Sequence, residues 1–503
     1  MALGRSFTAA LEGVTARIVT VEANIGPGLP GIHVVGLGDA AVSESRDRIR
    51  TAVANSRLSW PKTKIVVSMS PASLRKAGSH FDLPTALAVL GARVPDIAPV
   101  LDSTLIIGEL GLDGGVREVP GVLPALLAAR EHGFTKALIP PGNAAEATLV
   151  DGLAVFVAPT LAGAWDWVLG EGTLPMADGG VVAQERRIPD FTDIAGQPQA
   201  RLAAEVAAAG GHHMFLIGPP GSGKSMIATR LPGILPPLTP DQSLAVTAVH
   251  SVSGHPGVVR QAPFVAPHHS VTRSALLGGG SGLPRPGAVS LAHHGVLFLD
   301  EASEIPAAIL DGLRTPLEDG HVRLLRSRRE VIFPAQFQLV LAANPCQCAA
   351  DDPAVCRCSS SVRARYLANI SGPLRDRLDL IVRLRSTGAV LSTDGAESSA
   401  DIAERVCAAR DRALFRWRRH DLACDTNARM DPHLLRRHHP ADDAGMALLG
   451  VLLADGTLTQ RGVDRALKVA WTLADLAGEE HPDLGHIAAA VDLRGDEDAR
   501  AAA

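Results

Sequence analysis

The chain has 503 residues, of which 46% are hydrophobic and 20% are charged, and its formal net charge is −5 at pH 7. This length predicts about two to four domains, and the negative charge excludes a basic coat over the whole molecule, so any nucleic-acid surface must be local. Because no apolar run approaches the roughly 20 residues that cross a bilayer, and the first residues lack a signal-peptide core, we expect a cytoplasmic protein with no membrane contact whose six cysteines stay reduced unless they bind metal.

The first 172 residues alternate short apolar runs with Ala- and Leu-rich stretches, which predicts an α+β domain. The runs at 64–69 and 105–108 are typical of strands, and the stretches at 84–92 and 122–131 are typical of helices. Residues 173–190 are rich in Gly and Ala, show no clear period and are predicted to form a linker.

Residues 104–140, TLIIGELGLDGGVREVPGVLPALLAAREHGFTKALIP, resemble the proteolytic domain of Lon, an S5-like α+β fold that cleaves peptides with a serine–lysine dyad. On that pattern His80 stands where the nucleophilic serine belongs, and Leu123 stands where the lysine belongs. Ser79 is adjacent, but without the lysine nothing nearby lowers its pKa. The resemblance therefore implies a domain that keeps the fold, has lost the protease and serves assembly or substrate contact.

The sequence GPPGSGKS at 218–225 predicts a nucleoside triphosphate site. It follows an apolar run at 214–217, typical of a buried strand, and precedes residues 226–230, which can open a helix. Its glycines let the backbone curl so that its N–H groups point at phosphates. We expect Lys224 to reach the β- and γ-phosphates and the Ser225 hydroxyl to ligate Mg²⁺. The residues predicted to contact the nucleotide are Gly218, Pro219, Pro220, Gly221, Ser222, Gly223, Lys224 and Ser225.

Two further apolar runs, 296–299 and 339–342, end in polar side chains that suit nucleotide hydrolysis. After the first, Asp300 is expected to hold the Mg²⁺ shell, and Glu301 to orient and deprotonate the attacking water. A solvated acidic turn is the alternative for this pair. After the second, Asn344 is expected to hold the water from the opposite side, and a turn Asn before a proline is the alternative. Strands that alternate with helices predict a parallel sheet with the phosphate site at its carboxyl edge.

These features resemble the magnesium-chelatase-like group of AAA+ ATPases, and within it the ComM/YifB subfamily. The motifs that carry the resemblance are FTDIAGQ at 191–197, APHHSVTRSALLGGG at 266–280, PRPGAVSLAHHGVLFLDE at 284–301, PLEDG at 316–320 and SGPLRDRLDL at 371–380. The resemblance covers nearly the whole chain and implies an α/β fold, with an AAA+ core over 191–385 and a helical lid over 386–503. It also implies ATP and Mg²⁺ as ligands and a homo-hexameric ring as the working form.

The resemblance also implies roles for two arginines in ATP hydrolysis. Arg377 matches the arginine finger that enters the neighbouring subunit's site; Arg375 and a surface ion pair for Arg377 are the alternatives. Arg461 matches the second sensor arginine on the lid, which would contact the γ-phosphate of its own subunit. Arg465, one helical turn further on, or a solvated helix charge is the alternative.

Four of the six cysteines stand close together, and four thiolates in two pairs suit a structural tetrahedral zinc ion. The C-x-C spacing is tighter than the usual C-x₂-C, and reduced free thiols are the alternative. The candidate zinc ligands are Cys346, Cys348, Cys356 and Cys358. Cys407 and Cys424 are interpreted as ordinary buried residues, and His268 and His269 as structural or pore-facing.

Apolar and polar residues alternate along 321–333, which predicts a β-hairpin with a basic turn. This hairpin either binds phosphates in a central pore or is exposed to solvent without a ligand. A further group of arginines lies at 405–419 and is consistent with contacts to DNA phosphates. The subfamily resemblance implies a helicase that moves branched or single-stranded DNA during recombination in natural transformation. A magnesium-chelatase-type motor and a protein-remodelling or regulatory ATPase are the alternatives.

Overall fold

The computed structural model describes most of the chain. The described residues are 2–35, 40–74, 76–178, 187–280, 284–326, 329–350, 356–385, 396–420, 422 and 424–495. Residues 179–186 of the predicted linker and residues 386–395 at the start of the predicted lid therefore lie outside the described residues. Within the described part, no helix combines the length and the apolar character needed to cross a membrane.

The amino-terminal part is built on a seven-stranded mixed sheet in the order β3-β4-β2-β1-β5-β8-β9. Its first two strands pair antiparallel along their whole length, from Ala2–Ile25 to Glu12–Thr15. The strands are β1 Ala2–Glu12, β2 Thr15–Gly26, β3 Gly31–Val35, β4 Lys64–Ser70, β5 Thr104–Ile106, β8 Lys136–Ile139 and β9 Ala154–Val157, with a small ribbon of β6 Glu109–Leu110 and β7 Val116–Arg117. The helices are α1 Ala40–Asn55, α2 Asp82–Gly91, α3 Ala98–Asp102, α4 Val122–Glu131, α5 Ala144–Ala147 and α6 Leu161–Leu169. The four elements predicted from the sequence are present, whereas the long β1–β2 pair was not predicted.

The central part is a five-stranded, wholly parallel sheet in the order β11-β14-β17-β10-β18, as the alternation of strands and helices predicts. Its strands are β11 Phe264–Val265, β14 Val296–Leu299, β17 Gln338–Ala343, β10 Met214–Ile217 and β18 Leu380–Arg383. Every residue of β10, β14 and β17 is buried, because helices cover both faces of the sheet. The helices are α7 Pro198–Gly210, α8 Lys224–Arg230, α9 Pro240–Val252, α10 Arg273–Leu277, α11 Ala288–Leu291, α12 Ala307–Leu310, α13 Arg314–Asp319, α14 Ser360–Ala368 and α15 Gly372–Arg375.

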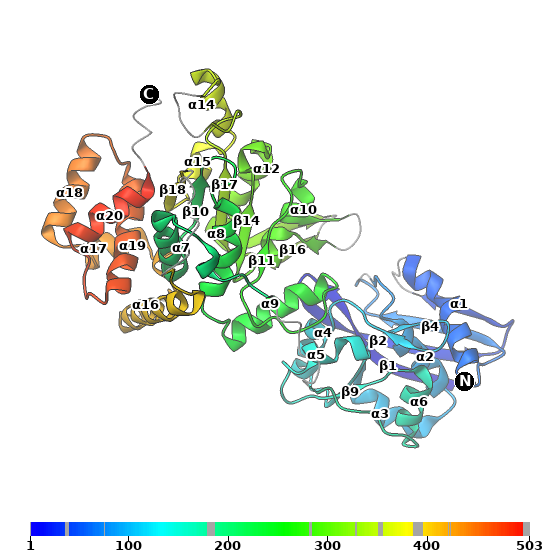
Figure 1. The fold of residues 1–503 in the computed structure, drawn as a ribbon. Helices are drawn as coiled ribbons and strands as arrows, with labels where there is room; N and C mark the ends of the chain where they lie inside the picture. The colour runs from blue at the N-terminus through cyan, green and yellow to red at the C-terminus, as the bar shows by residue number, and fades with distance from the viewer. Residues whose placement is uncertain are drawn as a thin grey trace.

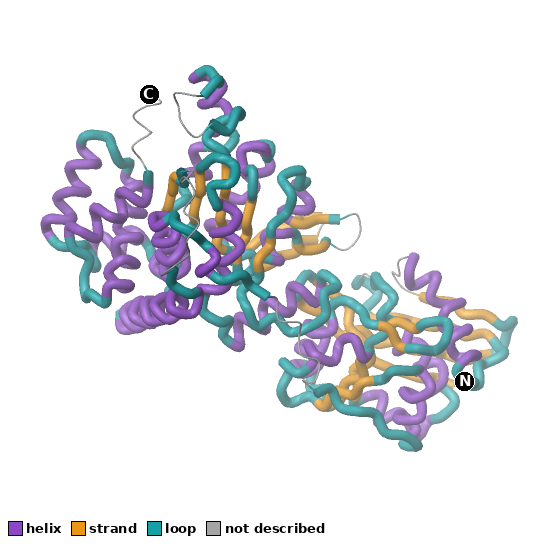
Figure 2. Tube along the Cα trace, in the orientation of Figure 1, coloured by secondary structure: helices purple, strands orange, loops and turns teal. Residues whose placement is uncertain are grey.

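The carboxyl-terminal part is helical, as expected (Figure 2). It consists of α16 Ser399–Arg419, α17 Pro432–His438, α18 Asp443–Ala454, α19 Gln460–Ala477 and α20 Leu484–Arg494. Trp417 and Trp471 pack edge to face at its centre, with ring centroids 5.8 Å apart. They belong to one apolar core with α7, Met214 and Leu216, so the lid and one face of the parallel sheet share a core. Phe215 and Ile217 point into a second core on the other face.

The helix α9 joins the central part to the amino-terminal part (Figure 1). Its Ala248 is buried in the apolar cluster formed by α4, and Leu244 packs against the same cluster. The N–H of Gly121, just before α4, donates to the carbonyl oxygen of Ser251 at 3.0 Å. The two parts are therefore packed against each other as well as linked through the chain.

Candidate functional site

The phosphate loop lies at the carboxyl end of β10, as predicted, and leads directly into α8. Gly221 and Gly223 have φ angles of +77° and +95°, a conformation that side chains with a Cβ adopt only with strain. Burial lowers the pKa of Lys224, whose ammonium donates to the carbonyl oxygens of Gly218 at 2.6 Å and Pro219 at 2.8 Å. The helix begins at Lys224, two residues earlier than the sequence predicts.

Polar groups from neighbouring strands meet at this loop. The Ser225 hydroxyl donates to Asp300 Oδ2 at 2.7 Å, and Lys224 donates to Asn344 Oδ1 at 3.2 Å. The pairing of β10 with β17, and of β17 with β14, brings these side chains to one edge of the sheet. The predicted residues Lys224, Ser225, Asp300 and Asn344 therefore lie together.

These groups fit a triphosphate with its magnesium ion. The Ser222 hydroxyl is buried and has no hydrogen-bond partner in the described part of the chain, which leaves a donor free for a phosphate oxygen. Lys224 donates to backbone carbonyls that a phosphate can replace as acceptors, since an ammonium has three donor hydrogens. The Ser225 and Asp300 oxygens are the hard ligands that Mg²⁺ prefers.

Glu301 has a partner that sequence reasoning missed. Its Oε2 lies 2.8 Å from Nδ1 of His269, in the segment after β11, and its backbone has a φ of +49°. Both side chains are partly exposed, at 39% for His269 and 51% for Glu301. The sequence contains the His268–His269 pair, but only the strand order β11-β14 shows that His269 reaches the end of β14. His269 is thus placed to orient the carboxylate of the candidate base.

The two assigned arginines lie at the opposite edge of the sheet. Arg377 precedes β18 and donates to Glu318 and to the carbonyl oxygen of Pro373, while Arg375 is exposed at the end of α15. Arg461 donates to Asp376 at 3.3 Å, in an exposed pair. Because β18 runs parallel to β10, and four residues span about 10 Å at about 3.3 Å per residue, this edge is remote from the phosphate loop of the same chain. The position does not agree with the expectation that Arg461 contacts the γ-phosphate of its own subunit.

Arg465 differs from Arg461 in being half-buried in a polar network. It donates to Asp379, which also accepts from the backbone N–H of His213 and lies 3.2 Å from Nδ1 of His212. Burial raises the pKa of Asp379, but Arg465 and His212 outweigh it and hold the pKa well below its usual range. Arg465 therefore fastens the lid to the core.

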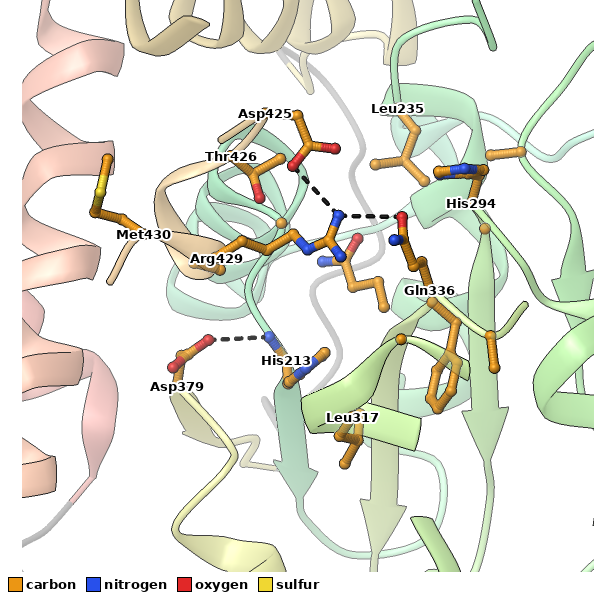
Figure 3. A pocket seen from close by; sticks show the side chains of 18 of the residues that line it. His213, Leu235, His294, Leu317, Gln336, Asp379, Asp425, Thr426, Arg429 and Met430 are labelled. Atoms are coloured by element: carbon orange, nitrogen blue, oxygen red, sulfur yellow. Dashed lines mark hydrogen bonds and ion pairs between the residues drawn. The ribbon is translucent and has the colours of Figure 1, made fainter. Parts of the chain in front are cut away.

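A cavity of about 690 Å³ lies at this same edge, between the lid and the sheet (Figure 3). Arg429 extends across it between Asp425 and Gln336, and Asp379 lies at its wall beside His213. Burial lowers the pKa of His213 to about 4, so its imidazole is neutral at pH 7. Arg377 and Arg465 also line the cavity, whereas none of residues 218–225 does. The cavity is thus separate from the phosphate loop.

The four candidate zinc ligands converge. The Sγ atom of Cys346 lies 3.3 Å from that of Cys348 and 3.5 Å from that of Cys356, and all four sulfurs lie within 4.8 Å of one another. This cluster could hold a zinc ion. Cys407 and Cys424 are half-buried and lie outside it.

The arginines of 405–419 are mostly engaged within the protein, contrary to their expected availability for DNA. Arg405 pairs with Glu205 and Glu397, Arg410 donates to Ala208, and Arg412 and Arg416 donate to Asp475. Arg418 and Arg419 are exposed at the end of α16. The charge available for a phosphate backbone on this helix is therefore much smaller than the sequence indicates.

The predicted hairpin is present as β15 His321–Arg326 and β16 Arg329–Pro334, while the turn at 327–328 lies outside the described residues. Val322 and Phe333 are buried, whereas Arg323 faces outward and pairs with Glu330. Leu325, near the turn, is 77% exposed.

The positions of the Lon dyad do not form a serine–lysine pair. Leu123 is completely buried in the apolar cluster of α4, and His80 Nε2 lies 2.9 Å from the carbonyl oxygen of Ala9. Ser79 donates to Glu109, and the nearby Lys76 donates to the carbonyl oxygen of Pro71. The loss of the protease stays a prediction.

Comparison with known proteins gives matches along most of the chain. Residues 190–390 match the family model for magnesium chelatase, subunit ChlI; residues 21–143 match subunit ChlI of Mg-chelatase; and residues 396–494 match the carboxyl-terminal region of ChlI. The chain is 50% identical to the uncharacterized protein Rv2897c of Mycobacterium tuberculosis, over 98% of this chain and 99% of that protein. It is 38% identical to the uncharacterized protein YifB of Escherichia coli, over 98% and 97%. It is 37% identical to the competence protein ComM of Haemophilus influenzae, over 98% of each chain.

Proposed function

Because the chain belongs to the ChlI-like family of magnesium-chelatase AAA+ ATPases, in which it is homologous over its full length to YifB and ComM, we propose that it is a ring-forming motor that uses ATP hydrolysis to move branched DNA. One observation carries the motor half of this proposal. The phosphate loop with Asp300, Glu301 and Asn344 lies at one edge of the parallel sheet, and Arg377 lies at the other.

The residues at the carboxyl edge of the sheet have separate roles in ATP hydrolysis. Lys224 would balance the charge of the phosphates, and Ser225 and Asp300 would hold a magnesium ion, which would supply charge neutralisation at the phosphate oxygens. Glu301, oriented by His269, accepts a proton from the attacking water at a carboxylate oxygen. Asn344 orients the same water through its amide.

The arginines at the amino edge then act on the nucleotide of an adjoining subunit. Arg377 cannot reach its own phosphate loop from this edge, so its charge serves the loop of a neighbour. Among the described residues, Arg461 is held by an exposed pair with Asp376, which is weak enough for the side chain to turn toward the same neighbour. An arginine supplied in this way is worth about 10³–10⁵ in rate. The proposed working form is therefore a homo-hexameric ring, with ATP and Mg²⁺ between adjacent subunits.

The DNA half of the proposal rests on the likeness to a competence protein and on the hairpin β15–β16. Recombination of incoming strands in natural transformation is the process in which we place it. The hairpin carries an outward-facing Arg323 and an exposed Leu325, a combination of phosphate contact and apolar wedge that suits a DNA strand. With most arginines of α16 engaged elsewhere, the hairpin is the better candidate for the DNA contact.

The test is the ATPase rate per subunit, measured against protein concentration with and without a four-way DNA junction. We expect the rate per subunit to rise with concentration as rings form, and to rise further with the junction but little with linear duplex. A rate that is independent of concentration would refute the ring. Stimulation by a porphyrin with partner subunits, or by an unfolded protein instead of the junction, would refute the DNA substrate in favour of a chelatase motor or a protein-remodelling ATPase.

A further inference from the structure

We propose that Cys346, Cys348, Cys356 and Cys358 hold one zinc ion, and that this ion sets the rate of ATP hydrolysis by fixing the positions of Asn344 and Glu301. The proposal rests on the proposed ATPase function and adds a control of its hydrolysis step. It follows from the geometry of the cysteine cluster, from the poor packing of the segment that carries it, and from the two connections of this segment to the hydrolysis site.

The geometry of the cluster fits zinc. Zinc–thiolate bonds of about 2.3 Å place the sulfurs of a tetrahedral site about 3.8 Å apart. Three of the Sγ–Sγ distances are 3.3, 3.5 and 3.5 Å, and the fourth sulfur lies within 4.8 Å of the others. Cys346 is buried and Cys348 is exposed, so the cluster opens to solvent on one side and a metal ion can enter.

The described residues around the cluster, 344–350 and 356–369, form no apolar core of their own. The helix α14, which follows Cys358, has no buried side chain, and its residues are all described. Leu367 packs against the apolar core of the sheet but is only partly buried, so hydrophobic burial contributes little to this helix. Small units of this kind are usually held by a metal or by disulfides. The four cysteines are the groups in this segment that can supply the missing free energy.

Both ends of the segment are attached to the hydrolysis site. At its start, Asn344 stands two residues before Cys346 and accepts a hydrogen bond from Lys224 at 3.2 Å. At its end, Asn369, just after α14, donates to the carbonyl oxygen of Ser303 at 2.6 Å. Ser303 belongs to the short turn that directly follows Glu301. A metal ion in the cluster therefore ties the residue that orients the water to the backbone that carries the base.

Loss of the ion should affect turnover and spare ATP binding. The contacts expected to hold the phosphates come from residues 218–225, which form the loop after β10 and the first two residues of α8. Lys224 also donates to the carbonyl oxygens of Gly218 and Pro219, so the loop itself holds this side chain when its contact with Asn344 is lost. The water-orienting groups depend on it at both ends. Misplacement of such groups by about 1 Å costs on the order of 100-fold in rate.

The experiment compares the wild-type chain with Cys348→Ser and with Cys407→Ser, a matched control on α16 outside the cluster. Zinc is measured by atomic emission, ATP affinity by calorimetry and turnover by phosphate release at saturating ATP and Mg²⁺. We expect one zinc ion per chain in the wild type and in the control. Cys348→Ser should lose the zinc and about 10- to 100-fold of its turnover, with an ATP Kd within about twofold of wild type.

Two further arms cover the chance that Cys348→Ser does not fold. Zinc is removed from the wild type with a zinc-selective chelator in excess Mg²⁺, and turnover should fall and return when zinc is added back. Cobalt added to the depleted protein should give the strong visible bands of a tetrahedral thiolate site. Asn369→Ala should keep its zinc and still lose turnover, because it cuts the connection to Ser303.

Wild-type protein without zinc and without the cobalt spectrum would overturn the metal site. Zinc removal that leaves turnover unchanged, or full turnover in Asn369→Ala, would overturn the link to hydrolysis. If the wild type binds zinc but hydrolyses no ATP, the proposed ATPase function itself fails, and the metal content and the cobalt bands distinguish that failure from the absence of a metal site.

Discussion

Replacing Arg465 should destabilise the lid, whereas replacing Arg461, one helical turn earlier on α19, should leave the stability of the lid nearly unchanged. The two guanidinium groups pair with Asp379 and Asp376 respectively. Asp379 is 1% exposed and Arg465 is 22% exposed, while Arg461 and Asp376 are 70% and 47% exposed. Methionine keeps most of the length of arginine and removes the charge, so Arg465→Met and Arg461→Met form a matched pair.

The magnitude follows from the burial of each aspartate. Arg465→Met leaves the Asp379 carboxylate buried without its strongest partner, and such a loss costs about 3–5 kcal/mol. The exposed pair of Arg461 contributes less than about 1 kcal/mol. With a urea slope of about 2 kcal/mol/M, the buried substitution should lower the unfolding midpoint by about 2 M.

The effect should also depend on pH. In the wild type the pKa of Asp379 is held below its unfolded value, so its contribution to stability is present at neutral pH and is lost as the pH falls. Without Arg465, the pKa of Asp379 loses the largest of the contributions that lower it and rises, so the carboxyl takes up a proton more readily as the pH falls. The difference in stability between the wild type and Arg465→Met should therefore be largest near pH 7 and shrink toward pH 4.

The assay is urea unfolding followed by fluorescence, with Trp60, Trp165 and Trp167 replaced by Phe so that the signal comes from Trp417 and Trp471 in the lid. Equal midpoints for Arg465→Met and wild type, or an early midpoint for Arg461→Met, would refute the assignment of Arg465 to structure. ATP turnover measured on the same proteins should fall strongly in Arg461→Met, although the lid of this variant stays as stable as that of the wild type.

Four further predictions concern the hydrolysis site and the contact between domains. Lys224→Ala should abolish ATP binding in calorimetry, whereas Glu301→Gln should bind ATP and lower turnover by about 10²-fold or more; strong binding by the first variant would contradict the phosphate-loop assignment. Arg377→Ala should lose most of its ATPase activity. Mixing it with Glu301→Gln should restore part of this activity, because one variant supplies the base and the other supplies the arginine. Mixtures no more active than their components would exclude action between subunits. His269→Ala should lower turnover several-fold at unchanged ATP affinity, with partial recovery in His269→Gln, and a rise in turnover would mean that the histidine restrains Glu301 instead of orienting it. Burial raises the pKa of Glu146 to about 7, so the stability of the amino-terminal domain should fall as the pH rises from about 4.5 to 7. Glu146→Gln should remove this slope and stabilise the domain by about 3 kcal/mol above pH 7, at about 1.4 kcal/mol per pKa unit, in thermal unfolding across pH; an unchanged slope would count against this account.

Much of the fold could be predicted because the apolar runs are short, buried and bounded by polar or glycine residues. The strand at 214–217 and the helix at 122–131 have the predicted bounds, and the parallel order follows from their alternation. The positions of Lys224, Asp300 and Asn344 at one edge also follow, because the carboxyl ends of parallel strands meet there.

The partners of individual side chains could not be predicted in the same way. Whether an arginine is free or engaged depends on which elements pack beside it, so Arg405 and Arg416 looked available for DNA although both are paired within the protein. The contact of His269 with Glu301 depends on strand order, and the position of Arg461 depends on which edge of the sheet the lid covers. These contacts join residues that are far apart in the sequence, so no local sequence pattern predicts them.

The helix α9 has a consequence for how movement spreads through the molecule. It is part of the apolar interior of the amino-terminal domain through Leu244 and Ala248, and its His250 Nε2 lies 3.0 Å from the carbonyl oxygen of Leu291, at the end of the helix that precedes β14. A shift of β14 during turnover would thus be transmitted through the helix α9 to the amino-terminal domain. Cutting the chain at the linker would separate α9 from the apolar interior of the amino-terminal domain and expose apolar surface on both fragments. We therefore expect neither fragment to be stable and soluble alone.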